Sequence, residues 1–194
     1  MHQPKNDMNE ITRMLAEHQM DHRFLEARKI FLWGGVDDES SERLVKQLLY
    51  LEEADAKADI EFYINSPGGV ITAGLAVYDA MQALSCDVHT ICTGQAASMG
   101  AVLLTAGAAG KRSAWKHARV MIHQPLIHGR MYAPASDLEI QAEEMLRVRD
   151  ELNQILAAHT GKAVEKIAED TDRDNFMNAA EAIEYGLIDS VIEP

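Results

Sequence analysis

The sequence predicts a single α/β domain, because strand-like and helix-like runs alternate along a chain of one-domain length. A chain of 194 residues is long enough for one sizeable hydrophobic core and shorter than the length at which cores divide. Its 47% hydrophobic and 25% charged residues are typical of an ordinary globular protein. Short β-branched or aromatic runs end in glycine, and runs with apolar residues at helical spacing follow them.

The first half of the chain contains three of these strand and helix pairs. The strands are expected at residues 28–33, 59–65 and 87–93. The helices are expected to begin at Ser40 or Ser41, at Val70 and near Met99. This regular alternation indicates an α/β domain.

The second half is dominated by one long helix. It is expected to run from about residue 136 to about residue 160, where Gly161 stops it, after a strand at 118–122. At about 1.5 Å per residue it spans more than roughly 30 Å, so we expect it to project and to pack on something else. The remaining expected elements are helices at 164–167 and 178–185, the second capped by Asn178, and a strand at 187–192.

Residues 1–24 are predicted to form an N-terminal arm, and residues 25–194 the domain itself. The arm is polar and shows only a weak helical pattern, at Ile11, Leu15 and Met20. It lacks the basic and apolar regions of a secretory signal, and no run in the chain is long and apolar enough to span a bilayer. A cytoplasmic location is therefore expected.

The net charge of -13 argues against nucleic acid or an anionic membrane as a partner. Phosphate backbones attract clusters of lysine and arginine, which this chain lacks. The two cysteines, Cys86 and Cys92, lie at the two ends of one predicted strand, too far apart along an extended chain for a disulfide. Both are expected to be reduced core residues.

The segment GQAASMGA, residues 94–101, places Ser98 between a predicted strand and the start of a helix. At such a junction the hydroxyl lies beside unpaired amides and the positive end of a helix dipole, which suits a nucleophile. The small residues around it let a substrate backbone approach closely. A surface serine that caps the helix has the same pattern, so both interpretations stay open on this segment alone.

The turn SPGG, residues 66–69, follows a predicted strand and precedes a helix. Its two glycines permit backbone conformations that turn an N–H outward, where it can bind an anion. A nucleotide phosphate loop is excluded, because Gly110-Lys111 is followed by Arg112, and Gly161-Lys162 by Ala163, instead of serine or threonine. The turn is therefore expected to serve an oxyanion, or to be a tight turn only.

Of the eight histidines, His123 is the one that directly ends a predicted strand. In a largely parallel sheet it would lie at the same edge as Ser98, although a hydrogen-bonded core histidine also fits this position. Asp172 and Asp174 are the carboxylates available to orient its imidazole. No histidine or cysteine pair has the spacing of a zinc site, so no metal is expected.

Four segments in this order resemble the ClpP family, the proteolytic subunits of ATP-dependent Clp proteases. They are YINSPGG (63–69), GQAASMGA (94–101), MIHQP (121–125) and DRDNF (172–176). The resemblance extends from about Leu25 to Ile192. It implies the ClpP/crotonase fold, with repeated ββα units and the long helix as a projecting handle.

The resemblance also implies a serine endopeptidase with a Ser-His-Asp triad. Ser98 matches the family nucleophile, His123 the general base, and Asp174 the acid, which follows an arginine in the family. The amides of Gly69 and Met99 match the oxyanion hole. The implied substrate-cleft residues are Gly68, Val70, Pro125 and Leu126, and the implied contacts between two rings are Asp172 and Arg173.

The family assembly implies a homo-oligomer, a tetradecamer of two stacked heptamers around a closed chamber. Unfolded polypeptides would be fed into it by a Clp-type AAA+ unfoldase and cut to short peptides. The chain has no nucleotide site of its own, so no cofactor is expected, and ATP is used by the partner unfoldase.

Two departures from the family pattern support an alternative, a structural or regulatory paralogue active only in a mixed ring with a second ClpP paralogue. The N-terminal segment lacks the residues that build the axial pore hairpin of the family. On the surface that receives the unfoldase, Tyr63 is kept, but Glu61, Ser113 and Trp115 replace aromatic or aliphatic residues. A second alternative, an acyl-thioester enzyme on the related crotonase fold, would use a similar oxyanion hole without this serine and histidine.

Overall fold

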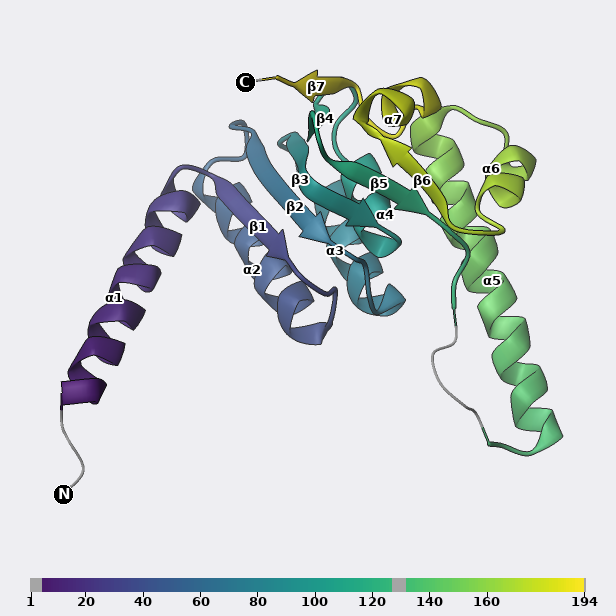
Figure 1. Ribbon diagram of the computed structural model, residues 1–194, viewed down its shortest axis with the longest axis horizontal. Coiled ribbons are helices and arrows are strands. Elements are labelled where there is room, and N and C mark those ends of the chain that lie inside the picture. Colours follow the sequence, from purple (N-terminus) through teal and green to yellow (C-terminus); the bar gives the residue numbers. More distant parts are fainter. Residues whose placement is uncertain (1–4, 127–131, 194) are drawn as a thin grey trace.

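The computed structural model describes residues 5–126 and 132–193, which form seven helices and one seven-stranded sheet (Figure 1). The strands are β1 (Lys29–Trp33), β2 (Ile60–Ser66), β3 (Val88–Ala97), β4 (Arg112–Trp115), β5 (Arg119–Ile122), β6 (Asn175–Asn178) and β7 (Ser190–Ile192). The helices are α1 (Lys5–Glu26), α2 (Asp38–Ala54), α3 (Ile71–Ala83), α4 (Met99–Thr105), α5 (Ala135–Thr160), α6 (Val164–Asp170) and α7 (Ala179–Tyr185). The α/β fold class is confirmed.

The sheet divides at β3, whose two halves pair with different strands. The order β1-β2-β3-β4-β7 runs through its first half, while β5 pairs with its second half and with β6. All pairs are parallel except β5 with β6. The carboxyl ends of β2, β3 and β5 therefore lie at one edge, with Ser66 beside Ala96 and Ala97 beside Met121.

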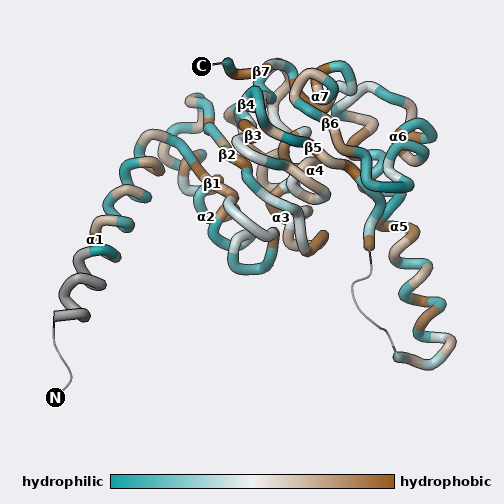
Figure 2. The backbone as a smooth tube through the Cα atoms, in the orientation of Figure 1, coloured by the Kyte–Doolittle hydropathy of each residue, from teal (hydrophilic) through white to brown (hydrophobic). Residues whose placement is uncertain are grey.

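The core lies between the sheet and the helices α2, α3 and α4, which cover one of its faces (Figure 1). Strand β2 alternates strictly between buried and half-buried residues, as expected for a strand with one face on the core. Its residues Ile60, Phe62 and Ile64 are fully buried. Figure 2 shows that the strands carry many of the hydrophobic residues, whereas α6 is largely hydrophilic.

Helix α2 begins earlier than the sequence predicted. Its cap is Asp37, whose carboxylate accepts a hydrogen bond from Ser40 N–H at 2.8 Å, while Asp37 N–H donates to Ser40 Oγ at 2.9 Å. The prediction of Ser40 or Ser41 as the cap was wrong, because Ser40 is the other half of this capping box. Ser41 instead donates its hydroxyl to the Ala73 carbonyl of α3. The predicted cap of α7, Asn178, is confirmed.

Helices α1 and α5 extend beyond the body of the protein (Figure 1). The predicted arm is a helix over most of its length, and it meets the body where Phe24 packs edge-on against Phe31, 5.0 Å between ring centroids. Residues 1–4 of the predicted arm lie outside the described residues. Only the later part of α5 is buried, at Leu152 and Leu156, so the part nearer residue 135 forms the predicted projection. Among the helices described, none has the length and apolar character needed to cross a membrane.

Candidate active site

Ser98 occupies a strained turn between β3 and α4. Its φ of 56° and ψ of -124° are unfavourable for a residue with a side chain, and Arg28 is the one other non-glycine residue with positive φ in the described ranges. Strain of this kind concentrates at functional sites. Although Ser98 stands at the cap position of α4, it makes no side-chain capping hydrogen bond. The geometry therefore does not support the alternative that Ser98 is only a helix cap.

The turn after β2 packs directly against Ser98. Gly68 has a φ of 91°, and a Cβ there would lie 2.6 Å from Ser98 Cβ and 2.7 Å from the Ala97 carbonyl oxygen. Only a glycine fits this approach. The Gly68 N–H donates to Ser66 Oγ at 3.1 Å, so this amide is already satisfied.

The next amide, that of Gly69, is oriented differently. Val36 N–H donates to Gly68 O and Val70 N–H donates to Val36 O, which is the pattern of a parallel bridge between Val36 and Gly69. In this pattern Val36 uses both its N–H and its C=O across the bridge, whereas the N–H of Gly69 points away from Val36. The Gly69 N–H is thus left available on the side of the turn away from Val36.

Met99 supplies a second available amide beside Ser98. It is the first residue of α4, so its N–H has no acceptor within the helix. Its side chain is buried and packs against Gly74 of α3, where a Cβ would overlap it. This packing fixes the start of α4, and with it the Met99 amide, relative to α3.

His123 and Asp174 are brought together by the antiparallel pair β5 and β6. Ile122 pairs with Asn175 in antiparallel register, so His123, which follows β5, faces Asp174, which precedes β6. His123 Nδ1 lies 3.0 Å from Asp174 Oδ1, and because a carboxylate only accepts, Nδ1–H is the donor. In the neutral imidazole, Nε2 is then the nitrogen that can accept a proton. The His123 side chain is 14% exposed and that of Asp174 is 59% exposed.

The end of β3 is tied to the end of β5, which places Ser98 near His123. Ser98 N–H donates to Met121 O at 2.9 Å. Both side chains line one cleft of about 720 Å³. No hydrogen bond joins Ser98 to His123, both of which are described. Such contacts are often long before a substrate binds.

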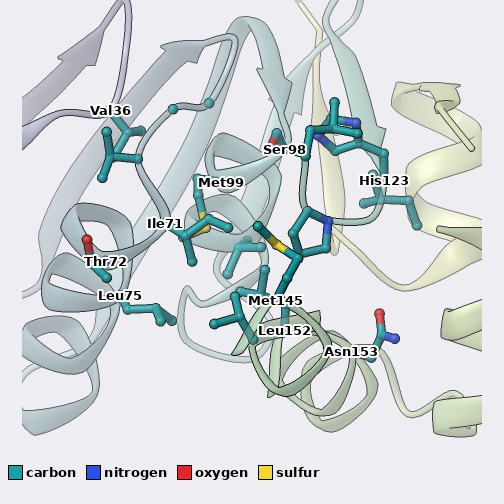
Figure 3. Close-up of a pocket in the computed structure, with 18 of the residues that line it drawn as sticks. Val36, Ile71, Thr72, Leu75, Ser98, Met99, His123, Met145, Leu152 and Asn153 are labelled. Carbon is teal, nitrogen blue, oxygen red and sulfur yellow. The ribbon is translucent and has the colours of Figure 1, made fainter. Parts of the chain in front are cut away.

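The cleft is mainly apolar and runs from the turn after β2 to the long helix. Figure 3 shows Ser98 and His123 at one end, α3 residues such as Ile71 and Leu75 on one wall, and α5 residues such as Met145 and Leu152 on another. The predicted substrate residues Gly68, Val70, Pro125 and Leu126 all line it.

The sequence analysis did not predict that α5 lines the cleft, although the helix carries apolar residues on one face. Met145 and Leu152 are apolar residues seven positions apart, so they fall on one face of the long helix, and such spacing indicates burial without indicating what the face covers. Gln124, which follows His123, was also not predicted. It donates from Nε2 to Asp172 O at 2.7 Å.

The remaining predicted residues, Asp172 and Arg173, lie on the surface next to Asp174. Their side chains are 64% and 86% exposed, and Arg173 Nε is 3.9 Å from Asp172 Oδ2. Within the ranges that the structure describes, no group of three or more histidine, cysteine or acidic side chains could hold a metal ion. Cys86 and Cys92 are buried and unpaired, and burial raises the pKa of the Cys92 thiol to about 12.

A comparison with protein families finds one match over almost the whole chain. The family described as Clp protease matches residues 13–194.

Proposed function

This chain belongs to the Clp protease family, and we propose that it is a proteolytic subunit, a serine endopeptidase that hydrolyses unfolded polypeptides to short peptides. The observation that carries the proposal is the hydrogen bond of 3.0 Å from His123 to Asp174, in the cleft that also holds Ser98. A nucleophile, a base and an acid in this arrangement are the parts of a serine peptidase triad.

In the proposed reaction His123 Nε2 takes the Ser98 proton as Oγ attacks the carbonyl carbon of the peptide bond. Asp174 holds Nδ1–H in place and stabilises the imidazolium that forms. His123 then gives the proton to the leaving nitrogen, the C–N bond breaks, and an acyl-enzyme ester remains on Ser98. Water attacks this ester with His123 again as base, the acid product leaves, and the proton returns to Ser98 Oγ.

The amides of Gly69 and Met99 are proposed to bind the oxyanion of each tetrahedral intermediate. Neither N–H donates to a backbone carbonyl of the residues that the structure describes. Met99 follows Ser98 in the chain, and Gly69 lines the same cleft as Ser98. One such donor contributes roughly 10²- to 10³-fold to kcat in serine peptidases. The apolar walls of the cleft suit an apolar substrate side chain.

The finer features of the family are part of the same proposal. We expect two stacked heptamers around a closed chamber, with α5 and the exposed pair Asp172 and Arg173 at the contact between rings. A Clp-type AAA+ unfoldase supplies unfolded chains and uses the ATP, so the subunit itself needs no cofactor. A cytoplasmic location fits this role.

A fluorophosphonate probe tests the proposal directly. It is expected to label Ser98, as found by peptide mass spectrometry, because the probe reacts with activated serines. Ser98→Ala is expected to abolish labelling. Ser98→Ala or His123→Ala is expected to lower kcat by up to about 10⁶-fold, since triad residues act as a unit.

Ser113 provides a matched control. Its hydroxyl also contacts a histidine, His89 Nε2 at 3.0 Å, but its side chain is fully enclosed, with 1% of the residue exposed. The expectation that Ser113 lies on the surface that receives the unfoldase was therefore wrong. Ser113→Ala should therefore leave both labelling and peptide hydrolysis unchanged. Labelling that persists in Ser98→Ala would refute the assignment of the nucleophile.

The missing hydrogen bond between Ser98 and His123 favours one second candidate, a paralogue that becomes active only in a mixed ring. Native mass spectrometry combined with a peptidase assay separates the two. A homogeneous tetradecamer that cleaves peptides supports the first proposal, whereas activity that requires a second type of subunit supports the other.

A further inference from the structure

The carboxylate of Asp174 is unusually exposed for a group that must orient a histidine. With 59% of its side chain in contact with solvent, it has His123 as its hydrogen-bond partner and little packing to hold it. An exposed pair of this kind is worth little by itself, because solvent competes and side-chain entropy opposes it. The backbone that carries Asp174 must therefore be held by something else.

We propose that Gln124 is a positioning residue of the active site, and that its amides hold the turn that carries Asp174 against His123. This inference rests on the proposed function. Gln124 N–H donates to Thr171 O at 2.6 Å, and Gln124 Nε2 donates to Asp172 O at 2.7 Å and to Asp172 Oδ1 at 3.2 Å.

The turn that carries Asp174 is attached to the His123 segment both before and after Asp174. After Asp174, the pairing of Asn175 with Ile122 fixes the chain to β5. Before Asp174, the bonds from Gln124 fix residues 171 and 172 to the segment that immediately follows β5. Asp174 is thus held between two attachments, both to the segment that bears His123, so the two members of the pair move together.

Thr171, whose carbonyl accepts the Gln124 N–H, is itself held firmly in place. Thr171 is 2% exposed, and its hydroxyl donates to Ile167 O at 2.8 Å and lies 3.2 Å from Asn153 Oδ1. Thr171 N–H also donates to Ile167 O. Because Asn153 belongs to α5 and Ile167 to α6, Gln124 connects the His123 segment to two helices and not to a loose loop.

A double-mutant cycle distinguishes positioning from general support of the fold. Gln124→Met keeps the side-chain volume but removes the amide donor, and it is expected to lower kcat for a short peptide by about 10- to 100-fold, with KM changed less than about 3-fold. Asp174→Asn alone is expected to lower kcat by up to about 10⁴-fold. If Gln124 acts through Asp174, adding Gln124→Met to Asp174→Asn should change kcat by less than about 2-fold.

A second variant and a control keep the result interpretable. Gln124→Glu keeps the length and polarity but has no N–H to offer Asp172, so it should lower kcat at least as much as Gln124→Met. Gln19→Met changes an exposed glutamine of α1, far from the cleft, and should leave kcat unaltered. Equal melting temperatures for all variants would show that the fold is retained.

Two outcomes would overturn the inference about Gln124, and a third would overturn the proposed function as well. Full activity of Gln124→Met and Gln124→Glu, or an equal loss from Gln124→Met with and without Asp174, would show that Gln124 does not act through the acid. Failure of the unaltered protein to label at Ser98 would instead overturn the proposed function and this inference with it.

Discussion

Gly69 is the single residue on which the proposed oxyanion site depends most directly. A Cβ at this position would overlap the carbonyl oxygen of Val36, so any side chain must push the turn away from its bridge. Gly69→Ala is therefore expected to displace the amide and to lower kcat by roughly 10²- to 10³-fold, as loss of one oxyanion donor does. Steady-state peptide hydrolysis measures this.

Gly110→Ala is the control for the effect of backbone strain. Gly110 also has a positive φ, of 81°, but a Cβ there would meet nothing within 4 Å. It should cost about 1–2 kcal/mol of stability from the left-handed conformation and leave kcat unchanged. If Gly69→Ala and Gly110→Ala have the same kinetics, the Gly69 amide is not part of the reaction.

Residue patterns in the sequence were enough to identify candidates but not to orient their atoms. Ser98 and His123 stand at strand ends, and a largely parallel sheet brings such ends together. The orientation of the Gly69 N–H depends on a bridge to Val36, more than thirty positions earlier, which no local pattern encodes. The choice between Asp172 and Asp174 likewise depends on the register of β6, and only family resemblance indicated it.

At the scale of the elements, Arg112 of β4 forms an ion pair with Asp189, which precedes β7, and connects these two strands to the ends of two helices. Arg112, with 9% of its side chain exposed, donates to both carboxylate oxygens of Asp189 and to the carbonyl oxygens of His159 and Gly186. These carbonyls lie at the ends of α5 and α7. The Arg112 hydrogen bonds hold the pKa of Asp189 below its ordinary value of 3.8.

Arg112→Met is expected to destabilise the protein by about 3 kcal/mol at pH 7, because it leaves the Asp189 charge without its partner. A carboxylate with a lowered pKa contributes stability that is complete above its ordinary pKa and is lost as the pH falls below about 3.8. The difference in the free energy of unfolding between the variant and the unaltered protein should therefore become smaller as the pH falls from 7 to below about 3.8. Urea unfolding at both pH values checks this, and a difference that grows in acid would contradict it.

The two strands that the sequence did not predict are the short ones that depend on distant partners. Strand β4 consists of RSAW, in which a buried arginine hides the strand pattern, and the carboxylate that pairs with this arginine, Asp189, lies 77 positions later in the sequence. Strand β6, NFMN, has Phe176 exposed and Met177 buried, and it exists by pairing with β5. By contrast, α5 and α7 were predicted well, because Gly161 and Asn178 are local stop and start signals.

At the scale of the whole molecule, one body carries the complete candidate site and one helix stands apart from it. Ser98, His123, Asp174 and the residues that line the cleft all lie in this body, between Val36 and Asp174 in the sequence. Helix α1 exposes Met14 and Leu15 by 63% and 58% and extends away from the sheet (Figure 1). Its contact with the body lies at its end, where Phe24 meets Phe31.

Removal of residues 1–22 is therefore expected to leave the body intact. The shortened chain keeps Phe24 against Phe31, and it keeps the Arg23 carbonyl that accepts from Ala27 N–H. Little buried surface is lost, so the melting temperature should change by less than about 2 °C, which corresponds to less than roughly 1 kcal/mol for a domain of this size. Hydrolysis of a short peptide should stay within about 2-fold.

Removal of residues 1–33 is the matching control, because it also deletes β1. Ile30 and Leu32 are completely buried in the core, and burial of each such side chain is worth about 1.5–3 kcal/mol. This longer truncation should not fold, whereas the shorter one should. Thermal unfolding followed by circular dichroism separates them: a fall of more than about 5 °C on removal of residues 1–22 would mean that α1 belongs to the core, and that the domain does not begin near residue 25.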